Sequence, residues 1–180
     1  MPAPTDAPVI TTERLILRAH TPQDFADGVA MWSDPEVTRY ITGRPSTSEE
    51  VWARILRYAG GWKLLGFGYW AITDRATGRF LGEGGFHDLK RDFHPPFDGA
   101  PEIGWGLTSA AQGRGYAHEA TRAMLDWSDG ALSDASRTVC LIGPENAPSL
   151  KLAGKLGYVQ YARTDYRGEP VILFERPRPV

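Results

Sequence analysis

The sequence predicts one domain of the mixed α/β class (α+β), in which helices cover a mixed β-sheet. The chain has 180 residues, of which 42% are hydrophobic and 23% charged, and this suits one globular domain with a substantial core. Apolar and alternating segments of strand length occur in runs, and segments with helical periodicity lie between them. Strands in runs with helices interspersed are typical of a mixed sheet that is covered by helices.

Residues 1–10 are expected to form a flexible tail, and residues 11–180 a single domain. The first eight residues are rich in Pro and Ala, and they lack the basic start and the apolar core of a signal peptide. No apolar run approaches the length that spans a bilayer. We therefore expect a cytoplasmic protein that does not use a membrane as a partner.

The charge and the cysteine and histidine content argue against a nucleic-acid surface, a disulfide and a metal site. The formal net charge is -2, so nothing indicates the broad cationic surface that nucleic-acid phosphates require. Cys140 is the single cysteine, which rules out an intrachain disulfide. Adjacent ligand histidines and a Cys-x-x-Cys pair are also missing from the sequence. We therefore expect neither a metal site nor a nucleic-acid partner.

The first half of the domain predicts one strand, two helices and a β-hairpin. Thr21 and Pro22 suit the N-cap and the first position of a helix, and Ser46–Glu49 resembles the capping box of a second helix. Gly60-Gly61 is expected to end that second helix. The expected elements are a strand over 15–17, helices from Thr21 and from Ser46, and strands over 67–73 and 79–86 around a turn at 74–78.

The second half predicts a loop and then strands that alternate with helices. The clearest helix follows a glycine-rich stretch and carries Ala120, Met124 and Trp127 on one apolar face. Gly157 is expected to end a shorter helix. In order, the expected elements are a loop over 87–99, a strand over 102–107, the long helix, a strand over 137–142, the short helix over 146–156, and strands over 158–163 and 171–175.

The segment 107–117, between a strand and the clearest helix, is the most informative part of the sequence. Gly113 and Gly115 let successive N–H groups face one concavity, and the following helix adds its unpaired N–H groups. Such a segment binds phosphate, and Arg114 adds a positive charge. An ordinary glycine-rich turn would show the same pattern. A nucleotide P-loop would need Gly-Lys-Ser/Thr, and a dinucleotide fingerprint would need a smaller residue than His118.

Gln112-x-x-Gly115-x-Ala117 matches the pyrophosphate-binding signature of the GNAT superfamily of acyl-CoA N-acyltransferases. The resemblance extends from about Thr11 to Pro177. The opening Thr12–Arg18 resembles one branch, the ribosomal-protein N-terminal acetyltransferases. The other segments that carry the resemblance are Pro101–Leu107, Gly113–Ala120, Asn146, Ser149 and Lys155–Tyr158.

The resemblance implies a strongly twisted mixed sheet that splays between its fourth and fifth strands and holds acetyl-CoA in the splay. The pyrophosphate is expected on the backbone amides of the glycine loop, and the pantetheine arm along the strand that ends near Thr108. Asn146 is expected to cap the short helix, to contact the pantetheine arm, or to do both. The residues expected to bind the cofactor are Leu107, Thr108, Gln112, Gly113, Arg114, Gly115, Tyr116, Ala117 and Asn146.

Glu102 is the expected proton acceptor. Acetyl transfer from a thioester requires a proton acceptor for the amine, a donor for the oxyanion and a proton for the departing thiolate. A backbone N–H near Leu107 is the expected oxyanion donor. Strand alternation puts Glu102 on one face with Gly104 and Gly106, and the glycines would leave room for a substrate. The alternative is a solvated glutamate at the end of a strand.

Ser149 is expected to assist departure of the thiolate. Many family members carry a tyrosine in the short helix as general acid, and this sequence has none between Asn146 and Leu156. Ser149 occupies a matching region, and in the ribosomal-protein branch a serine there is associated with the thiol. Its alternative role is to cap the helix.

The function that the resemblance implies is transfer of an acetyl group from acetyl-CoA to a primary amine, by direct attack in a ternary complex. The acceptor would be a protein N-terminus or a small-molecule amine. Loop 87–99 is its expected place of entry, because Asp88, Asp92 and Asp98 would attract an ammonium group. The loop could instead cover the sheet or contact a second subunit of a homodimer. The alternative function is an acyl-CoA-binding regulator or scaffold without transfer activity.

Overall fold

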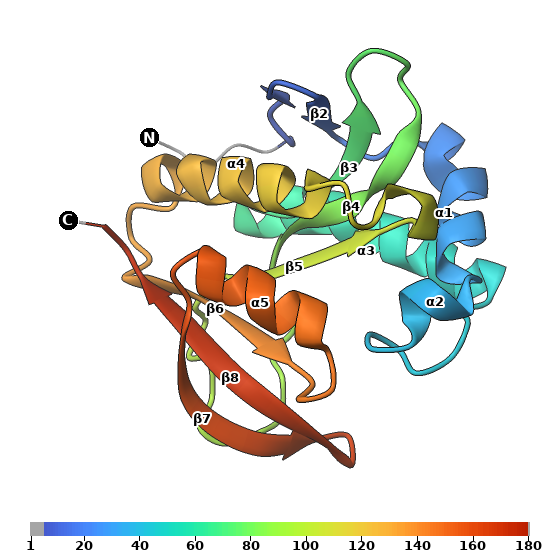
Figure 1. Ribbon diagram of the computed structural model, residues 1–180. Helices are drawn as coiled ribbons and strands as arrows, with labels where there is room; N and C mark the ends of the chain where they lie inside the picture. The colour runs from blue at the N-terminus through green and yellow to red at the C-terminus, as the bar shows by residue number, and fades with distance from the viewer. Residues whose placement is uncertain (1–5, 180) are drawn as a thin grey trace.

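The computed structural model describes residues 6–179, which form one mixed sheet with helices on both faces (Figure 1). This confirms the predicted fold class. The strands are β1 Ile10–Thr11, β2 Leu15–Arg18, β3 Tyr69–Asp74, β4 Phe80–His87, β5 Glu102–Leu107, β6 Arg137–Ile142, β7 Val159–Tyr166 and β8 Glu169–Pro177. They lie side by side in the order β1-β2-β3-β4-β5-β6-β8-β7.

The sheet opens between β5 and β6. β4 and β5 pair in antiparallel register along the whole of β5, from Gly82 opposite Leu107 to His87 opposite Glu102. β5 and β6 are parallel, and within residues 6–179 their register contains one pair, Glu102 opposite Val139. Beyond that pair the two strands diverge (Figure 1). These strands are the fourth and fifth that the sequence predicts, because the short β1 was not expected.

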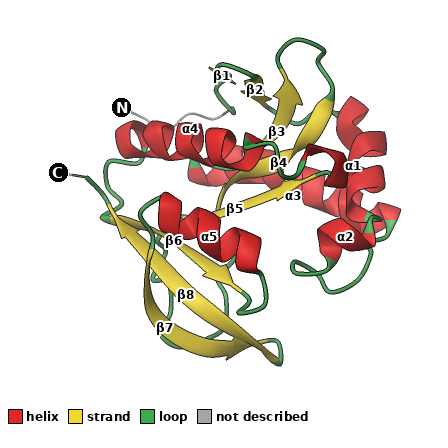
Figure 2. Cartoon of the chain, in the orientation of Figure 1, coloured by secondary structure: helices red, strands yellow, loops and turns green. Residues whose placement is uncertain are grey.

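Over residues 6–179 the helices are α1 Phe25–Trp32, α2 Pro35–Thr38, α3 Ser48–Leu65, α4 Tyr116–Ala131 and α5 Ala147–Lys155. α4 covers one face of the central strands, where Met124 approaches Gly84 of β4. α1 and α3 cover the other face, where Met31 approaches Gly106 of β5. We call this second face the α3 face; Figure 2 shows α3 and α4 on opposite sides of the strands. None of these helices combines the length and the apolar character needed to cross a membrane.

The hydrophobic core has two parts, one on each side of the central strands. The larger part includes Trp70, Phe86 and Met124 beneath α4. The smaller part includes Trp32 and Ile55 between α1, α3 and the sheet. Burial of such side chains from water is the main term that holds the helices on the sheet.

α3 differs from its prediction at both ends. Its capping box is formed by Thr47 and Glu50, one residue later than expected, and each side chain accepts the backbone N–H of the other. Gly60-Gly61 does not end the helix, because Trp62 in the next turn is buried against the sheet and carries the helix past both glycines. The helix ends at Gly66, which has a φ of 74° in the left-handed region.

The N-terminal segment joins the sheet earlier than expected. Ile10 pairs with Leu17, and Trp70 Nε1 donates a hydrogen bond to the Pro8 carbonyl at 2.7 Å. Residues 1–5 of the expected tail lie outside the described residues. α2 was not predicted either; Pro35 starts it, and Asp34 accepts a hydrogen bond from the Glu36 N–H.

Candidate active site

The glycine loop between β5 and α4 has the backbone geometry of an anion site. Residues 112–115 are exposed. Gly113 and Gly115 have φ angles of 73° and 79°, in the left-handed region that favours glycine. Gly115 is the N-cap of α4 and provides no side-chain hydrogen bond to the first-turn N–H groups. The loop can therefore present backbone N–H groups to a phosphate at the positive end of the α4 dipole.

The residues expected to bind the cofactor lie in two places. Leu107, Thr108 and Gln112–Ala117 run from the end of β5 through the loop into α4. Gln112 Nε2 donates a hydrogen bond to the Leu107 carbonyl at 3.2 Å, so this side chain ties the loop to the end of β5. Asn146 lies apart from this path, at the N-terminus of α5.

Asn146, and not Ser149, caps α5. Asn146 Oδ1 accepts the backbone N–H of Ser149 at 3.2 Å. Ser149 is half-buried, and its hydroxyl makes no hydrogen bond to any part of the chain that the structure describes. The alternative role of Ser149 as helix cap is therefore wrong, and its hydroxyl is available for another contact.

Glu102 is buried in an ion pair rather than solvated at a strand end. Its side chain is 6% exposed and faces Arg91, whose Nε and Nη2 donate to the two carboxylate oxygens at 2.7 and 2.8 Å. His87 Nε2 lies 3.2 Å from Oε1, although the ring is not aligned for a hydrogen bond. Sequence reasoning did not single out Arg91, because its approach to Glu102 depends on the conformation of the intervening loop.

The ion pair sets the charge of Glu102. Burial raises the pKa of Glu102, but the neighbouring His87 and Arg91 lower it by more, so that it lies below its ordinary value. The carboxylate is therefore ionised at neutral pH.

The space that the strand glycines were expected to leave open is partly filled. A Cβ at Gly104 would collide with the Tyr69 hydroxyl, and one at Gly106 would lie 3.0 Å from Met31 Cε. These glycines therefore accommodate protein side chains on the α3 face. Gly104 and Trp105 are nevertheless half-buried, although they lie in the middle of β5. The opening beside β6 keeps this stretch of strand accessible.

A second buried carboxylate, Glu83, lies on the same face. It is 2% exposed and sits opposite Gly106 in the pairing of β4 with β5. It accepts hydrogen bonds from Trp32 Nε1, at 3.0 Å, and from the Tyr58 hydroxyl. Sequence reasoning missed Glu83; the signal was a charged residue between Gly82 and Gly84 in a strand that is otherwise apolar.

Aromatic rings connect the surroundings of the two carboxylates. Tyr58, beside Glu83, stacks on Tyr69 with ring centroids 4.5 Å apart. Tyr69 stacks on His87, beside Glu102, with centroids 5.2 Å apart. Burial raises the pKa of both tyrosines, so they are neutral hydrogen-bond donors at neutral pH.

Loop 87–99 packs against the β7–β8 hairpin as well as reaching Glu102. Arg91 lies 4.8 Å from the centroid of the Tyr166 ring, and Phe93 contacts the same ring. Lys90 pairs with Asp88, which neutralises one of the three expected acidic groups. A cavity beside Glu102 is lined by Asp88, Leu89, Lys90, Arg91, Pro96, Phe97, Asp98 and Gly99.

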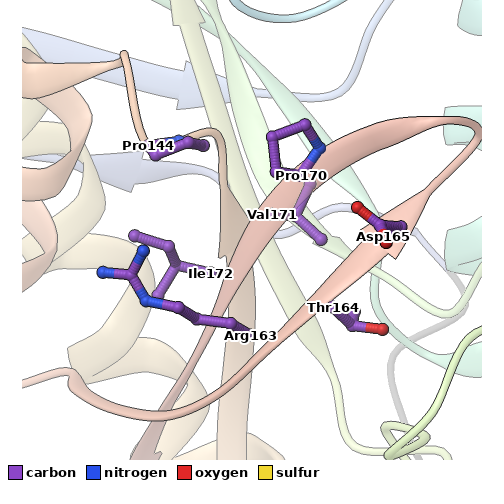
Figure 3. A pocket seen from close by; sticks show the side chains of 7 residues that line it. All are labelled: Pro144, Arg163, Thr164, Asp165, Pro170, Val171 and Ile172. Carbon is purple, nitrogen blue, oxygen red and sulfur yellow. The ribbon is translucent and has the colours of Figure 1, made fainter.

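A second cavity lies at the β7–β8 hairpin and contains none of the expected site residues. It is lined by Pro144, Arg163, Thr164, Asp165, Pro170, Val171 and Ile172 (Figure 3). Within residues 6–179, no group of three or more His, Cys, Asp and Glu side chains is arranged to hold a metal ion.

Known proteins are similar to this chain in both sequence and fold. Residues 14–159 match the Acetyltransferase (GNAT) domain family. The chain is 30% identical over 148 residues to the uncharacterized N-acetyltransferase p20 of Bacillus licheniformis, an alignment that covers 82% of this chain and 80% of p20. A putative GNAT-family acetyltransferase from Bordetella pertussis superposes with a TM-score of 0.83 and 35% identity, covering 94% of this chain and 99% of that one.

The fold also occurs in a more distant enzyme. RimL, the ribosomal L7/L12 alpha-N-protein acetyltransferase, solved in complex with coenzyme A, superposes with a TM-score of 0.76 at 16% identity. That alignment covers 94% of this chain and 98% of RimL. At this identity the likeness shows the shared fold.

This chain belongs to the GNAT family of acetyltransferases, and it is an N-acetyltransferase. The family uses acetyl-CoA as its acetyl donor. The resemblance from which the glycine loop was interpreted is therefore confirmed at the level of family and fold.

Proposed function

We propose that this protein transfers the acetyl group of acetyl-CoA directly to a primary amine in a ternary complex. The observation that carries this proposal is the exposed glycine loop at the N-terminus of α4, which follows the edge of β5 where the sheet opens. The loop suits a pyrophosphate, which accepts hydrogen bonds from backbone N–H groups. The free strand edge suits the amide groups of a pantetheine arm, which can pair with it as a strand does.

The cofactor-binding residues follow from this placement. Gly113, Gly115 and Tyr116–Ala117 hold the pyrophosphate through backbone N–H groups, and Arg114 adds charge. Leu107 lies beside the arm, and the backbone N–H near Leu107 donates to the oxyanion. Thr108 contacts the arm through its side chain, because its N–H and its carbonyl already form hydrogen bonds with Leu81 and Ala111. Asn146 combines its capping role with a contact to the arm.

The test of the function is thiol release from acetyl-CoA with a panel of amines. The panel contains peptides with free N-termini, amino acids and polyamines, and products are identified by mass spectrometry. Release that depends on the amine, with an acetylated product, is the expected result. CoA binding without release for any amine would favour the regulator or scaffold instead.

We assign proton transfer to Glu102 and Ser149. Glu102 receives the proton of the attacking amine through water, and its support is an ionised carboxylate at the junction of β5 and β6. Ser149 donates a hydrogen bond to the departing thiolate, and its support is a hydroxyl without another partner within residues 6–179.

Ser149→Ala is expected to lower kcat by about tenfold, because a hydrogen bond to a charged group contributes about 1.5 kcal/mol. CoA affinity should stay at the wild-type value, since the hydroxyl acts on the thiolate that forms during transfer. Steady-state kinetics and calorimetric titration with CoA measure the two quantities. Ser149→Thr keeps the hydroxyl and is the matched control. A wild-type kcat in Ser149→Ala would exclude the serine from the reaction.

We place entry of the amine beside loop 87–99, which contributes Asp98 to the cavity next to Glu102. Asp98 is the acidic group of this cavity that forms no ion pair within residues 6–179, because Asp88 pairs with Lys90 and Glu102 with Arg91. A negative rim attracts an ammonium group, and the attraction weakens with salt. A peptide N-terminus and a small amine both present this group.

Replacing residues 92–98 with a Gly/Ser linker is expected to raise the acceptor KM on the order of tenfold. Arg91 is kept so that its ion pair with Glu102 remains. CoA affinity and molecular mass should not change, and both are measured beside the kinetics. Altered mass with wild-type kinetics would identify the loop as a homodimer interface and contradict its acceptor role.

A further inference from the structure

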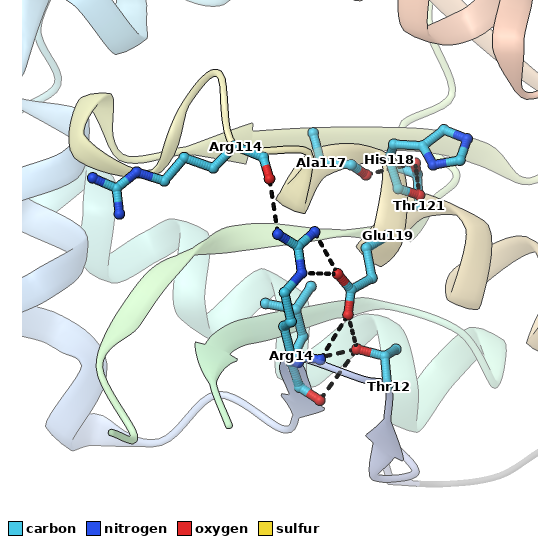
Figure 4. A network of polar contacts seen from close by, with 8 residues as sticks. Thr12, Arg14, Arg114, Ala117, His118, Glu119 and Thr121 are labelled. Carbon is cyan, nitrogen blue, oxygen red and sulfur yellow. Dashed lines mark hydrogen bonds and ion pairs between the residues drawn. The ribbon is translucent and has the colours of Figure 1, made fainter. Parts of the chain in front are cut away.

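Arg14, just before β2, reaches the glycine loop although 100 residues separate it from Arg114 (Figure 4). Arg14 Nη1 donates a hydrogen bond to the Arg114 carbonyl at 2.9 Å. Its guanidinium carbon lies 4.6 Å from the centroid of the Tyr116 ring. Its Nη2 lies 3.4 Å from the position of a Cβ on Gly115. One side chain therefore meets the last two loop residues and the first residue of α4.

Glu119, in the first turn of α4, fixes the Arg14 side chain. Arg14 Nε donates to Glu119 Oε2 at 2.7 Å, and Nη2 lies 2.7 Å from the same oxygen. Oε1 accepts the backbone N–H of Arg14 at 2.8 Å and the Thr12 hydroxyl at 2.5 Å. Burial raises the pKa of Glu119, but Thr12 and Arg14 lower it by more, so the carboxylate is ionised at neutral pH.

The bond to the Arg114 carbonyl also orients an N–H group. That carbonyl belongs to the peptide group whose N–H is the N–H of Gly115. In a planar trans peptide group the C=O and the N–H point in opposite directions. A donor that holds the carbonyl on one side therefore turns the Gly115 N–H to the other side. Figure 4 shows the Arg114 side chain extending away from Arg14.

We propose that Arg14 is a positioning residue for acetyl-CoA, which turns the Gly115 N–H toward the pyrophosphate and fixes the loop on the first turn of α4. This inference rests on the proposed function. Arg14 acts without touching phosphate, because its Nε and Nη2 face Glu119 and its Nη1 faces the Arg114 carbonyl. Arg114 has no acidic partner within residues 6–179, so its charge is the one that acts on phosphate.

Arg14→Ala is expected to weaken CoA binding about tenfold and to raise the KM for acetyl-CoA by the same factor. The kcat at saturating acetyl-CoA and the acceptor KM should not change. Titrations with CoA at several salt concentrations separate orientation from charge. The double variant Arg14→Ala/Glu119→Gln removes both charges of the ion pair, so the local net charge is unchanged and the salt dependence should stay at the wild-type value, whereas Arg114→Ala should flatten it. Arg14→Lys should behave as Arg14→Ala does, because an ammonium group cannot form the same fork of hydrogen bonds.

Arg122→Ala is the matched control, because Arg122 forms an exposed ion pair with Asp126 on the same helix. It should bind CoA as the wild type does. Thr12→Val removes a hydrogen bond to Glu119 without changing the charge, so it should weaken CoA binding in the same direction as Arg14→Ala, and it provides the test if Arg14→Ala does not fold.

Wild-type CoA affinity in folded Arg14→Ala or in folded Arg14→Ala/Glu119→Gln would overturn the inference. A flattened salt dependence in Arg14→Ala/Glu119→Gln would also overturn it, because Arg14 would then be a direct phosphate ligand. Failure of the unaltered protein to bind CoA would overturn the proposed function instead, so the two failures are distinguishable.

Discussion

Replacing Gly115 with valine is expected to weaken CoA binding by roughly 10- to 100-fold, because backbone strain of about 1–3 kcal/mol is converted into lost affinity. The φ of Gly115 is 79°, and a β-branched residue rarely adopts this conformation. A Cβ would already contact Arg14 Nη2 at 3.4 Å, so the two methyl groups of valine would crowd the side chain that holds the loop. Calorimetric titration with CoA measures the loss.

Two glycine variants separate the causes of this effect. A Cβ at Gly113 meets nothing within 4 Å although φ is 73°, so Gly113→Val tests backbone strain alone and should cause a smaller loss. A Cβ at Gly130 also meets nothing, and Gly130→Ala in α4 should bind CoA normally. A folded Gly115→Val protein with wild-type affinity would remove the loop from the cofactor site.

Glu102→Gln is expected to lower kcat at neutral pH by roughly 10²–10⁴-fold, the usual contribution of a general base. Activity should recover in part at high pH, where more of the amine is already deprotonated. The pH dependence of kcat measures both effects.

The ion pair makes a stability control necessary. Glutamine leaves the charge of Arg91 without its partner, and breaking a buried pair in this way costs about 3–5 kcal/mol. Thermal unfolding should therefore show a lower Tm for Glu102→Gln. The double variant Arg91→Met/Glu102→Gln removes both charges, so it should regain stability without regaining activity.

Arg91→Met alone is expected to move the acidic limb of the pH profile of kcat/KM to higher pH. Burial and His87 still act on Glu102 in this variant, but the lowering by Arg91 is lost, so the pKa of Glu102 rises. The lowered pKa of Glu102 also makes the stability of the wild-type protein depend on pH. The wild-type pKa lies below 4.5, so the stabilisation by this carboxylate is complete above about pH 4.5 and is lost as the pH falls through the folded value.

A wild-type pH profile in Glu102→Gln would exclude this residue as the proton acceptor. Glu83→Gln is the comparison, because Glu83 is a second buried carboxylate on the α3 face. If Glu83→Gln lost activity with recovery at high pH while Glu102→Gln did not, the proton acceptor would be Glu83.

Local patterns predicted most of the fold. The strand over 137–142 was predicted with the bounds that β6 has, and β5 likewise matches the expected 102–107. Periodicity and glycine geometry act within a few residues, so they are readable from sequence. The end of α3 was wrong because burial of Trp62 outweighs the low helix propensity of Gly60-Gly61, and that burial is a tertiary effect.

The parts of the candidate site that lie within a few consecutive residues were predictable from the sequence, and the contacts between residues far apart in the sequence were not. The loop 112–117 carries its own turn geometry in its glycines. The ion pair of Arg91 with Glu102 spans 11 residues, and that of Arg14 with Glu119 spans 105. No short-range pattern specifies such partners. Glu83 was missed because an apolar strand is interpreted as part of the hydrophobic core. Its hydrogen-bond donors, Trp32 and Tyr58, are evident only in the structure.

Within residues 6–179, one register pair joins β5 to β6, and this has a consequence for the free edge of β5. The sheet consists of two parts, β1–β5 and β6–β8, which meet where Glu102 faces Val139 and where the Val139 N–H donates to the Pro101 carbonyl. A ligand that pairs along the free edge of β5 would act as an additional strand and brace one part against the other. Glu102 lies at the closed end of the gap, opposite His87 of β4 and Val139 of β6. The proposed proton acceptor thus lies at the position of β5 that is paired with a neighbouring strand on each side.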